Sequence, residues 1–410
     1  MVDFYGRPGL EAHAFSLFCG FGAPLLKLVG GNTVKGAWVH LKNNGSGTGK
    51  STAQMVANSI FGHPSDLLMK KADTPNSKMH MLGMLNSLVF TVDEITNESS
   101  EALSEMAYGI TQGRGKHRMD GQSNRLRVNH TTWSTFTLSS GNASVVDMLM
   151  QLKSTADGEM RRVLELSVSK YLGATKAEID AVFSKLDSNY GVAGPIYVEY
   201  IMANREKVVD MVLRMQAKVD RELELDQSDR HYSLLLCCTF TGALIAERLG
   251  LHSIPIKPVY EYIKGEVQMN QAVNRLAVGD PYTVALETLG AFVNDNVNNA
   301  LVAPYTPPGG VPERPAIAPK GALRMRYDPD NKELAISAVE LRKYLTARQV
   351  DVKEAVGLLA ARGIVKHNGE ARPTRLGAGA VGGLNGISLR CYILDGDAIG
   401  IDREQFVSDD

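Results

Sequence analysis

A glycine-rich turn between a short apolar strand and an amphipathic helix constrains this chain more than any other feature. The turn occupies residues 44–49, and Lys50, Ser51 and Thr52 follow it directly. Apolar residues then recur at the spacing of one helical face: Ala53, Val56, Ala57 and Ile60. This order predicts a phosphate cradle, because glycine N–H groups can converge on an anion at a helix N-terminus.

The residue types in the turn suit a nucleotide. Lys50 would reach the β- and γ-phosphates, and the Ser51 hydroxyl would bind Mg²⁺. Where the usual pattern G-x-x-x-x-G-K-[ST] begins with glycine, this chain has Asn44, a residue type that tolerates positive φ. The alternative is a glycine-rich hairpin with an incidental lysine. The predicted nucleotide-binding residues are Asn44, Gly45, Ser46, Gly47, Thr48, Gly49, Lys50, Ser51 and Thr52.

An acidic pair follows an apolar, β-branched run at residues 88–92. The carboxyl end of a buried parallel strand would place both acids beside the nucleotide. Asp93 is then expected to hold the Mg²⁺ shell, and Glu94 to polarise the attacking water. Many strands end at an acid, so the spacing from the glycine turn is what gives this pair its weight.

Three further segments, residues 67–72, 133–140 and 163–168, are predicted strands. Asn142, beyond the second of these, could sense the γ-phosphate or could be an ordinary turn asparagine. Arg161 and Arg162 precede the third. They could be surface charge, or one could be an arginine finger that reaches the nucleotide of a neighbouring subunit.

A basic segment lies between the predicted helix at residues 97–112 and the strand at 133–140. Residues 114–127 carry five Arg or Lys against one acid, with glycines at both ends. Arg114, Lys116 and Arg118 are therefore predicted to touch DNA phosphates from a mobile hairpin. The alternative is a solvated surface turn.

The composition limits the class of protein. With 410 residues, two or three domains are expected. The net charge of −1 means that any nucleic-acid contact must come from local patches. The four cysteines show neither metal-ligand spacing nor a disulfide framework, as in a reducing cytosol. The N-terminus has no signal-peptide pattern. Two short helices are expected at residues 10–30. The apolar run at residues 234–246 is too short to cross a bilayer and predicts a buried helix.

The second half of the chain is predicted to be helical to about residue 302. Six of the 16 prolines then fall between Pro304 and Pro319, which predicts a linker. Two amphipathic helices and a hairpin beyond it suggest a winged helix that binds either DNA or protein. The expected domains are a helical lead-in (1–36), a P-loop ATPase core (37–170), a helical domain (171–303), the linker (304–322) and a winged-helix-like domain (323–410).

Taken together, these segments resemble the helicase-like domain of unknown function of phage and prophage primase-helicases, related to superfamily-three and poxvirus-type replicative helicases. The resemblance covers nearly the whole chain. Members usually carry Gly-Glu where this chain has Gly141 and Asn142, which is closer to the superfamily-three pattern. The motifs that carry the resemblance are residues 4–6 with 9–11, 47–51, 93–94, 113–116, 139–142 and 189–195.

The resemblance implies an α/β P-loop NTPase of AAA+/RecA-like type with a parallel sheet, helical additions and a C-terminal winged helix. It implies ATP and Mg²⁺ as cofactors and a ring, commonly hexameric, with each nucleotide between two subunits. One subunit would contribute Lys50, Ser51, Asp93, Glu94 and Asn142, and its neighbour Arg161 or Arg162. Lys116 and Arg118 would move along one DNA strand in the central channel.

The predicted function is therefore an ATP-dependent replicative DNA helicase of a phage or mobile element, in the cytoplasm of a bacterium or infected host. The expected partners are single-stranded and forked DNA, together with a primase or polymerase that is either fused or separate. Binding to a membrane is not expected. An alternative from another class is an ATP-switched, initiator-like DNA-binding or loading protein that does not translocate. The basic hairpin disfavours a third option, a protein remodeller.

Overall fold

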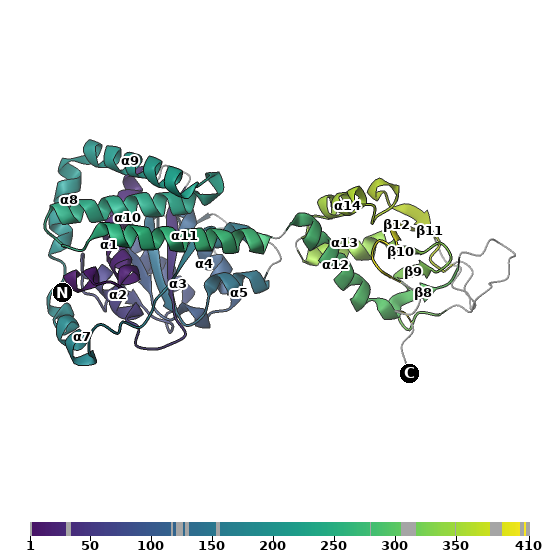
Figure 1. Ribbon diagram of the computed structural model, residues 1–410, viewed down its shortest axis with the longest axis horizontal. Coiled ribbons are helices and arrows are strands. Elements are labelled where there is room, and N and C mark those ends of the chain that lie inside the picture. Colours follow the sequence, from purple (N-terminus) through teal and green to yellow (C-terminus); the bar gives the residue numbers. More distant parts are fainter. Residues whose placement is uncertain are drawn as a thin grey trace. The chain divides into compact units, whose positions relative to one another are not determined.

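A computed structural model describes residues 2–29, 34–115, 118–119, 126–127, 131–152, 156–278, 280–304, 317–348, 350–377, 388–401 and 406. The chain divides into two compact units (Figure 1). The first comprises Met1–Leu152 and Ala156–Ala277, and the second comprises Val278–Asp410. Each unit has a hydrophobic core of its own.

A five-stranded parallel sheet forms the centre of the first unit, in the order β2-β3-β6-β1-β7. Each strand overlaps a segment that the sequence predicted, so the predicted α/β class with a parallel sheet is confirmed. The strands are β1 (Gly36–Lys42), β2 (Leu68–Met69), β3 (Phe90–Val92), β6 (Thr135–Gly141) and β7 (Val163–Ser167).

Alternation along β1 explains why helices cover both faces of this sheet. Val39 and Leu41 pack into a core shared with α1, α2 and α10, whereas Trp38 packs into a second core with α3, α4 and α5. Successive side chains of a strand point to opposite faces, so one apolar strand serves both cores. The helices of the first unit are α1 (Glu11–Val29), α2 (Lys50–Asn58), α3 (Pro75–Leu85), α4 (Ser100–Gln112), α5 (Val145–Leu152), α6 (Asp157–Met160), α7 (Lys176–Phe183), α8 (Ala193–Ala203), α9 (Arg205–Leu223), α10 (Arg230–Arg248) and α11 (Ile256–Val278).

The prediction of two short helices at residues 10–30 is wrong, because α1 is one continuous helix with Pro24 inside it. Its glycines provide close packing. A Cβ on Gly22 would lie 2.5 Å from the Cα of Thr239 on α10, and one on Gly20 would lie 2.6 Å from Ile60 Cδ1. Glycine here permits two helix backbones to approach, which the sequence alone did not distinguish from a break.

Gly22→Ala is expected to destabilise the first unit by on the order of 3 kcal/mol, because the added methyl group meets backbone that cannot move aside. The matched control is Gly265→Ala on α11, where an added Cβ has no atom within 4 Å. That change should stabilise by roughly 0.5–1 kcal/mol through helix propensity. Chemical denaturation of both variants tests this, and equal stability of the two would contradict the packing argument.

Both apolar helices of the first unit lie in its core. α1 is long and apolar enough to cross a membrane by length and composition, but 78% of the relevant window is buried inside the protein. Its composition therefore reflects its packing against α10. The buried helix predicted at residues 234–246 is confirmed as part of α10. All four cysteines are free and buried.

The second unit is built on a sheet in the order β11-β12-β10-β9-β8. Its pairs are antiparallel except for β8 with β9, which is parallel. The two predicted amphipathic helices are confirmed as α13 (Ala338–Ala347) and α14 (Val352–Ala361). The other elements are α12 (Pro281–Asp295), β8 (Ala300–Val302), β9 (Met325–Asp328), β10 (Glu333–Ser337), β11 (Arg372–Thr374) and β12 (Leu389–Asp395).

The domain borders expected at residues 171, 303 and 322 differ from this division. Helices α8, α9 and α10 share the core of the parallel sheet, while α12 and β8 belong to the core of the second unit. The Pro/Gly-rich segment at 304–322 therefore begins and ends inside the second unit. It connects β8 to β9, and parallel neighbours require a long crossover connection. Residues 305–316 of this segment lie outside the described part of the chain.

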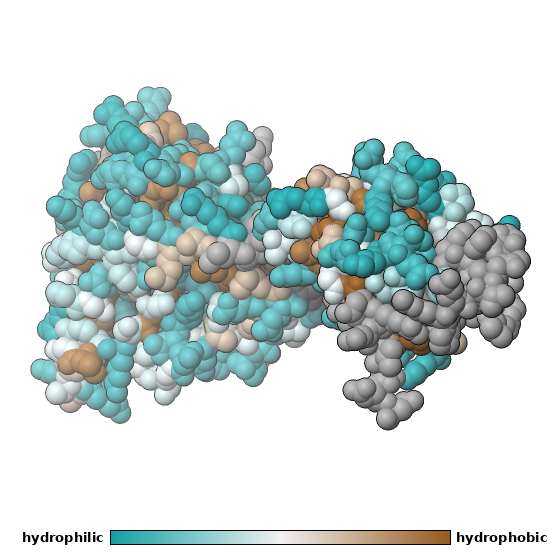
Figure 2. Space-filling model, turned by 45° about the vertical axis from the view of Figure 1, so that its right-hand side comes forward, coloured by the Kyte–Doolittle hydropathy of each residue, from teal (hydrophilic) through white to brown (hydrophobic). Residues whose placement is uncertain are grey.

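The face of the molecule drawn in Figure 2 is largely hydrophilic, with hydrophobic residues in small groups. Several large apolar side chains near the start of α8 and along it are nevertheless exposed. They are Val192, Ile196, Val198 and Met202. The N-terminus of α8 is fixed to the end of α2 by bonds from the Gly191 and Gly194 N–H groups to the carbonyls of Ser59 and Ile60.

Candidate nucleotide-binding site

Three loops that the sequence singled out meet at one edge of the parallel sheet. In the strand register Lys42 pairs with Gly141, and Val92 pairs with Ser139. The carboxyl ends of β1, β3 and β6 are therefore level with one another. Since ligands of open α/β sheets bind outside the carboxyl ends of the strands, this edge is the candidate site.

The glycine turn adopts the backbone that a phosphate cradle needs, but not at the position that the sequence suggested. Gly47 has φ 73° and Gly49 has φ 83°. Asn44 is not among the residues with positive φ, so its tolerance of that region is not used. An asparagine can replace the usual first glycine because the left-handed positions of this turn fall later, where glycine is retained.

Lys50 is the first residue of α2 and lies over the turn. Its Nζ donates hydrogen bonds to the carbonyls of Asn43 at 3.1 Å and Gly45 at 3.3 Å, and to Asn142 Oδ1 at 3.4 Å. Burial lowers the pKa of Lys50, and the charges of Asp93 and Glu94 act in the opposite direction. The lysine and the predicted sensor asparagine are thus brought together.

Ser51 and Asp93 are also brought together. Ser51 Oγ donates to Asp93 Oδ1 at 3.0 Å, and the Ser140 hydroxyl donates to the same oxygen. A hydroxyl and a carboxylate are hard oxygen ligands, and Mg²⁺ is typically held by one or two protein oxygens, phosphates and water. This donor pair therefore fits Mg²⁺, although no cluster of three or more His, Cys, Asp or Glu ligands occurs among the described residues.

Glu94 stands out by its backbone. It has φ 54°, in the left-handed region that a residue with a Cβ rarely occupies, and its side chain is exposed. Its N–H donates to Ser140 Oγ at 3.3 Å. Strain of this kind gathers at functional sites, where the surroundings hold it.

Asn142 is fixed by its own neighbours. Its N–H donates to Thr96 Oγ1 at 3.2 Å. The preceding residue must be small, since a Cβ on Gly141 would lie 2.4 Å from Thr96 Cγ2. The Gly-Asn pair therefore places an exposed carboxamide beside Lys50 at the carboxyl edge of the sheet.

Sequence reasoning missed two residues that shape this site. His13 of α1 donates its Nε2–H to the Thr48 carbonyl at 2.8 Å, and burial lowers its pKa, which favours the neutral imidazole. Gln54 of α2 is completely buried, and its Nε2 donates to the carbonyls of Val92 at 2.8 Å and Leu138 at 3.0 Å. In the predicted helix Gln54 lies off the apolar face of Ala53, Val56, Ala57 and Ile60, so the sequence pattern gave no sign of its burial. Nothing local marks the first.

The two arginines are not brought to this edge. Val163 at the start of β7 pairs with Trp38, so Arg161 and Arg162 lie toward the amino edge of the sheet. The Arg161 guanidinium is ion-paired with Asp157 and, at 3.1 Å, with Asp229. The Arg162 guanidinium lies 4.6 Å from the centre of the Tyr108 ring. Within one chain, both therefore bind structural partners far from Lys50.

The basic segment has the predicted hairpin form. β4 (Arg118–Met119) pairs antiparallel with β5 (Leu126–Arg127), and Arg114 bridges Thr132 at its base. Trp133 N–H donates to the Gly113 carbonyl there, just before β6 begins. The hairpin thus departs from the amino edge of the sheet, away from the glycine turn. Arg114 is exposed, and Lys116 lies outside the described residues.

Comparisons with known proteins found similarity to a family profile and to a solved structure. The profile of a domain of unknown function, DUF927, matches residues 11–129. A solved structure described as the active helicase Cch of SCCmec type IV aligns with a TM-score of 0.57 over 96% of this chain and 70% of that chain. The two sequences are 18% identical, so the likeness concerns the fold. No curated protein matches significantly. The structural likeness therefore shows a fold shared with that helicase.

Proposed function

We propose that the chain is an ATP-dependent DNA helicase. The observation that carries this proposal is the meeting of Lys50 with Asn142, and of Ser51 with Asp93, at the carboxyl edge of a parallel sheet. Such a set has what phosphoryl transfer needs: a cation for the phosphates, oxygen ligands for Mg²⁺ and a polar group near the transferred γ-phosphate. The helicase fold of the structural neighbour supports the choice.

Each residue then has a defined task. The N–H groups of residues 44–52 and the Lys50 ammonium bind the phosphates, and Ser51 and Asp93 hold Mg²⁺. The metal, when bound, neutralises charge that develops on the phosphate oxygens. Glu94 orients the attacking water and accepts its proton, and Asn142 contacts the γ-phosphate. Ser140 donates to Asp93, which orients that carboxylate.

DNA is proposed to bind at the basic hairpin, through Arg114, Lys116 and Arg118. Because the hairpin leaves the amino edge of the sheet, hydrolysis at the other edge must reach it through the strands or through a neighbouring subunit. A ring of like subunits, commonly hexameric, would supply that neighbour. The exposed apolar side chains of α8 support association, since exposed apolar patches mark interaction sites.

An arginine finger would make hydrolysis depend on assembly. Mixing Arg161→Ala or Arg162→Ala protein with Lys50→Ala protein is expected to restore part of the turnover, because some shared sites then hold an intact lysine and an intact arginine. Melting temperatures are recorded alongside, since both arginines have partners within the chain. If the loss of an arginine lowers the melting temperature and its mixtures recover no ATP turnover, that arginine has a structural role only.

The second unit is proposed to be a winged helix. The order β10, α13, α14, β11, β12, with β12 between β10 and β11, supports this. Of the basic residues near its hairpin, Lys366 is ion-paired with Glu333 at 3.1 Å and Asp395 at 3.6 Å. Arg372 is exposed. Lys366 is therefore a weaker candidate for DNA contact than Arg372.

The rate of ATP hydrolysis with and without single-stranded DNA tests the proposal. A helicase turns over ATP as it moves, so DNA should raise the rate several-fold, and Lys50→Ala protein should show no rate to raise. The alternative, an ATP-switched loading protein, binds DNA in the presence of ATP but hydrolyses it slowly whether or not DNA is bound. A slow rate that DNA leaves unchanged would support that alternative.

A further inference from the structure

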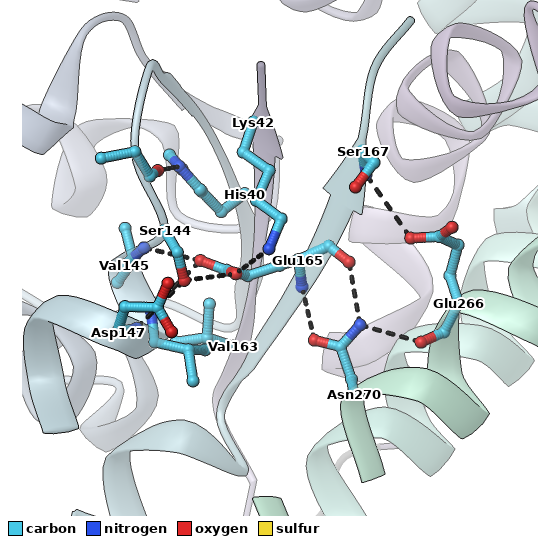
Figure 3. A network of polar contacts seen from close by, with 12 residues as sticks. His40, Lys42, Ser144, Val145, Asp147, Val163, Glu165, Ser167, Glu266 and Asn270 are labelled. Atoms are coloured by element: carbon cyan, nitrogen blue, oxygen red, sulfur yellow. Dashed lines mark hydrogen bonds and ion pairs between the residues drawn. The ribbon is translucent and has the colours of Figure 1, made fainter. Parts of the chain in front are cut away.

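Glu165 is a buried carboxylate on β7 that no step described so far uses. Its side chain is only 4% exposed. It points toward the loop that follows β6, and Figure 3 shows it between Lys42 of β1 and the start of α5. Burying a carboxylate is costly unless it is paired and hydrogen-bonded, so the groups around Glu165 must supply those partners.

Both carboxylate oxygens are occupied. Oε1 accepts the backbone N–H of Val145 at 2.6 Å and of Val146 at 3.1 Å. Oε2 accepts the Ser144 hydroxyl at 2.8 Å and is ion-paired with Lys42 Nζ at 2.8 Å. A carboxylate held by N–H groups at the start of a helix is favourably placed with respect to the helix dipole. Four donors from two different elements therefore converge on one side chain.

The first of these elements is the segment that carries the predicted sensor. Only Ala143 separates Asn142 from Ser144, Val145 and Val146. His40 of β1 holds that residue, because its Nε2–H donates to the Ala143 carbonyl at 3.1 Å. From Ala143 to Val146 each residue thus has a bond to a side chain of the sheet. Asn142 has little freedom to change its distance from Lys50 while these bonds last.

The second element is the exit of β1. Lys42 is the last residue of that strand, and only Asn43 separates it from the glycine turn of residues 44–49. Asn43 is bonded to the residue that directly follows β7, since its Nδ2 donates to the Val168 carbonyl at 2.6 Å. β7 therefore holds the entry of the phosphate cradle and the sensor loop at once, and Glu165 is the side chain common to the two.

We propose that Glu165 is a positioning residue for nucleotide hydrolysis, which holds the sensor loop of Asn142 against the phosphate cradle. This inference rests on the proposed function. Glu165 does not touch the nucleotide, so it acts through Asn142 and through the exit of β1. Its loss should leave phosphate binding by Lys50 and the glycine turn nearly intact while it slows the step for which Asn142 must be placed.

Helix α11 supports the same strand from its other side. Asn270 donates from Nδ2 to the Glu165 carbonyl at 2.9 Å and accepts the Glu165 N–H at 3.0 Å. Its amide thus satisfies the backbone of an edge strand at the residue that carries the carboxylate, as Figure 3 shows. The Ser167 N–H reaches Glu266 of the same helix at 3.4 Å. The backbone that presents Glu165 is therefore fixed.

The test is a double-mutant cycle of Glu165→Gln with Asn142→Ala in the full chain, read out as kcat and KM for ATP. Glutamine keeps the shape of the side chain but replaces one carboxylate oxygen by an NH₂ group. That group cannot accept the hydrogen bonds that the oxygen accepts. We expect Glu165→Gln to lower kcat at least about tenfold with KM changed less than about threefold. In the Asn142→Ala background the same change should have no further effect, because both act on one step.

Glu159→Gln is the matched control. Glu159 is buried too, at 2% exposed, and accepts from Ser104 and Tyr108 on α4, at a distance from the sensor loop. Its loss should cost stability without changing kcat. Effects of Glu165→Gln and Asn142→Ala that multiply, or a Glu165→Gln protein with wild-type kcat, would overturn the proposal. Failure of the wild-type protein to hydrolyse ATP would instead count against the proposed function.

Hydrogen exchange of residues 143–152 provides a readout that does not need hydrolysis. The Val145 and Val146 amides are bonded to Glu165, so Glu165→Gln should raise their exchange rate at least about tenfold, and Glu159→Gln should not. Wild-type protection of these amides in Glu165→Gln protein would overturn the clamp whatever the enzymatic result. Faster exchange in both variants would also overturn it, because it would reflect general loosening of the unit.

Discussion

Lys50→Ala is expected to lower ATP turnover by at least about 100-fold. The lysine is the only cation among the described residues that is hydrogen-bonded both to the glycine turn and to Asn142. Removing it takes away the charge that stabilises the transferring phosphoryl group. Steady-state hydrolysis measures the loss, and Lys257→Ala, an exposed lysine on α11, is the control for the loss of one positive charge.

Glu94→Gln should produce a loss of similar size by a different route. Glutamine preserves the shape of the side chain but cannot accept the proton of the attacking water, so nucleotide binding should persist while hydrolysis stops. Binding of a fluorescent ATP analogue separates the two effects. The exposed Glu261→Gln on α11 is the matched control. Near-wild-type hydrolysis by Glu94→Gln protein would show that Glu94 is not the base. Asp93 would then be the next carboxylate to test in that role.

The second large effect is expected at the basic hairpin. Replacing both Lys116 and Arg118 by alanine should abolish DNA-stimulated hydrolysis and strand separation while basal hydrolysis is spared. The hairpin leaves the amino edge of the sheet, whereas the proposed nucleotide site lies at the carboxyl edge. The slope of DNA affinity against salt concentration should also fall by about one unit for each phosphate that the hairpin no longer binds.

The control for this variant removes the same charge elsewhere in the first unit, at Arg205 and Lys207, which are exposed at the start of α9. Strand separation could survive the hairpin changes while Arg372→Ala in the second unit lowers DNA affinity. In that case the second unit, and not the hairpin, provides the main DNA contact. Loss of basal hydrolysis in the hairpin variant would contradict the separation of the two sites.

The strand, glycine turn and helix at residues 36–58 could be predicted because their signal is local. The turn at residues 44–49, Lys50 and Ser51 are contiguous, and the apolar strands before Asp93 and Asn142 are short and unbroken. Parallel strands bring their carboxyl ends to one edge, so strand recognition alone was enough to place these residues together. The structure brings Lys50 to Asn142 and Ser51 to Asp93 accordingly.

Features that depend on distant partners could not be predicted. Gly20 and Gly22 read as helix breakers because nothing near them in sequence reveals Thr239, the residue that Gly22 packs against. Glu165 reads as one acid in an ordinary strand, since its donors come from β1 and α5. The core that α8, α9 and α10 share with the parallel sheet depends on residues distant in sequence. The ion pair of Arg161 with Asp229 does too, so neither could be predicted without the fold.

The expected domain borders differ from the division into two units for a related reason. Proline and glycine between residues 304 and 319 mark irregular backbone, but a crossover loop inside one unit has the same composition as a linker between two. The parallel pairing of β8 with β9 decides between them, and the pairing joins segments on either side of the loop. The border between the two units falls near Ala277, at the end of α11, where Gly279, Asp280 and Pro281 mark only a break between two helices.

Strand separation of a forked DNA duplex tests the central claim most directly. The wild-type protein with ATP and Mg²⁺ is predicted to release the labelled strand, and with a non-hydrolysable ATP analogue it should bind the fork without opening it. Lys50→Ala and Glu94→Gln proteins should not separate the strands under either condition. Wild-type protein that binds the fork and hydrolyses ATP, yet leaves the duplex intact at saturating concentration, would contradict the assignment as a helicase.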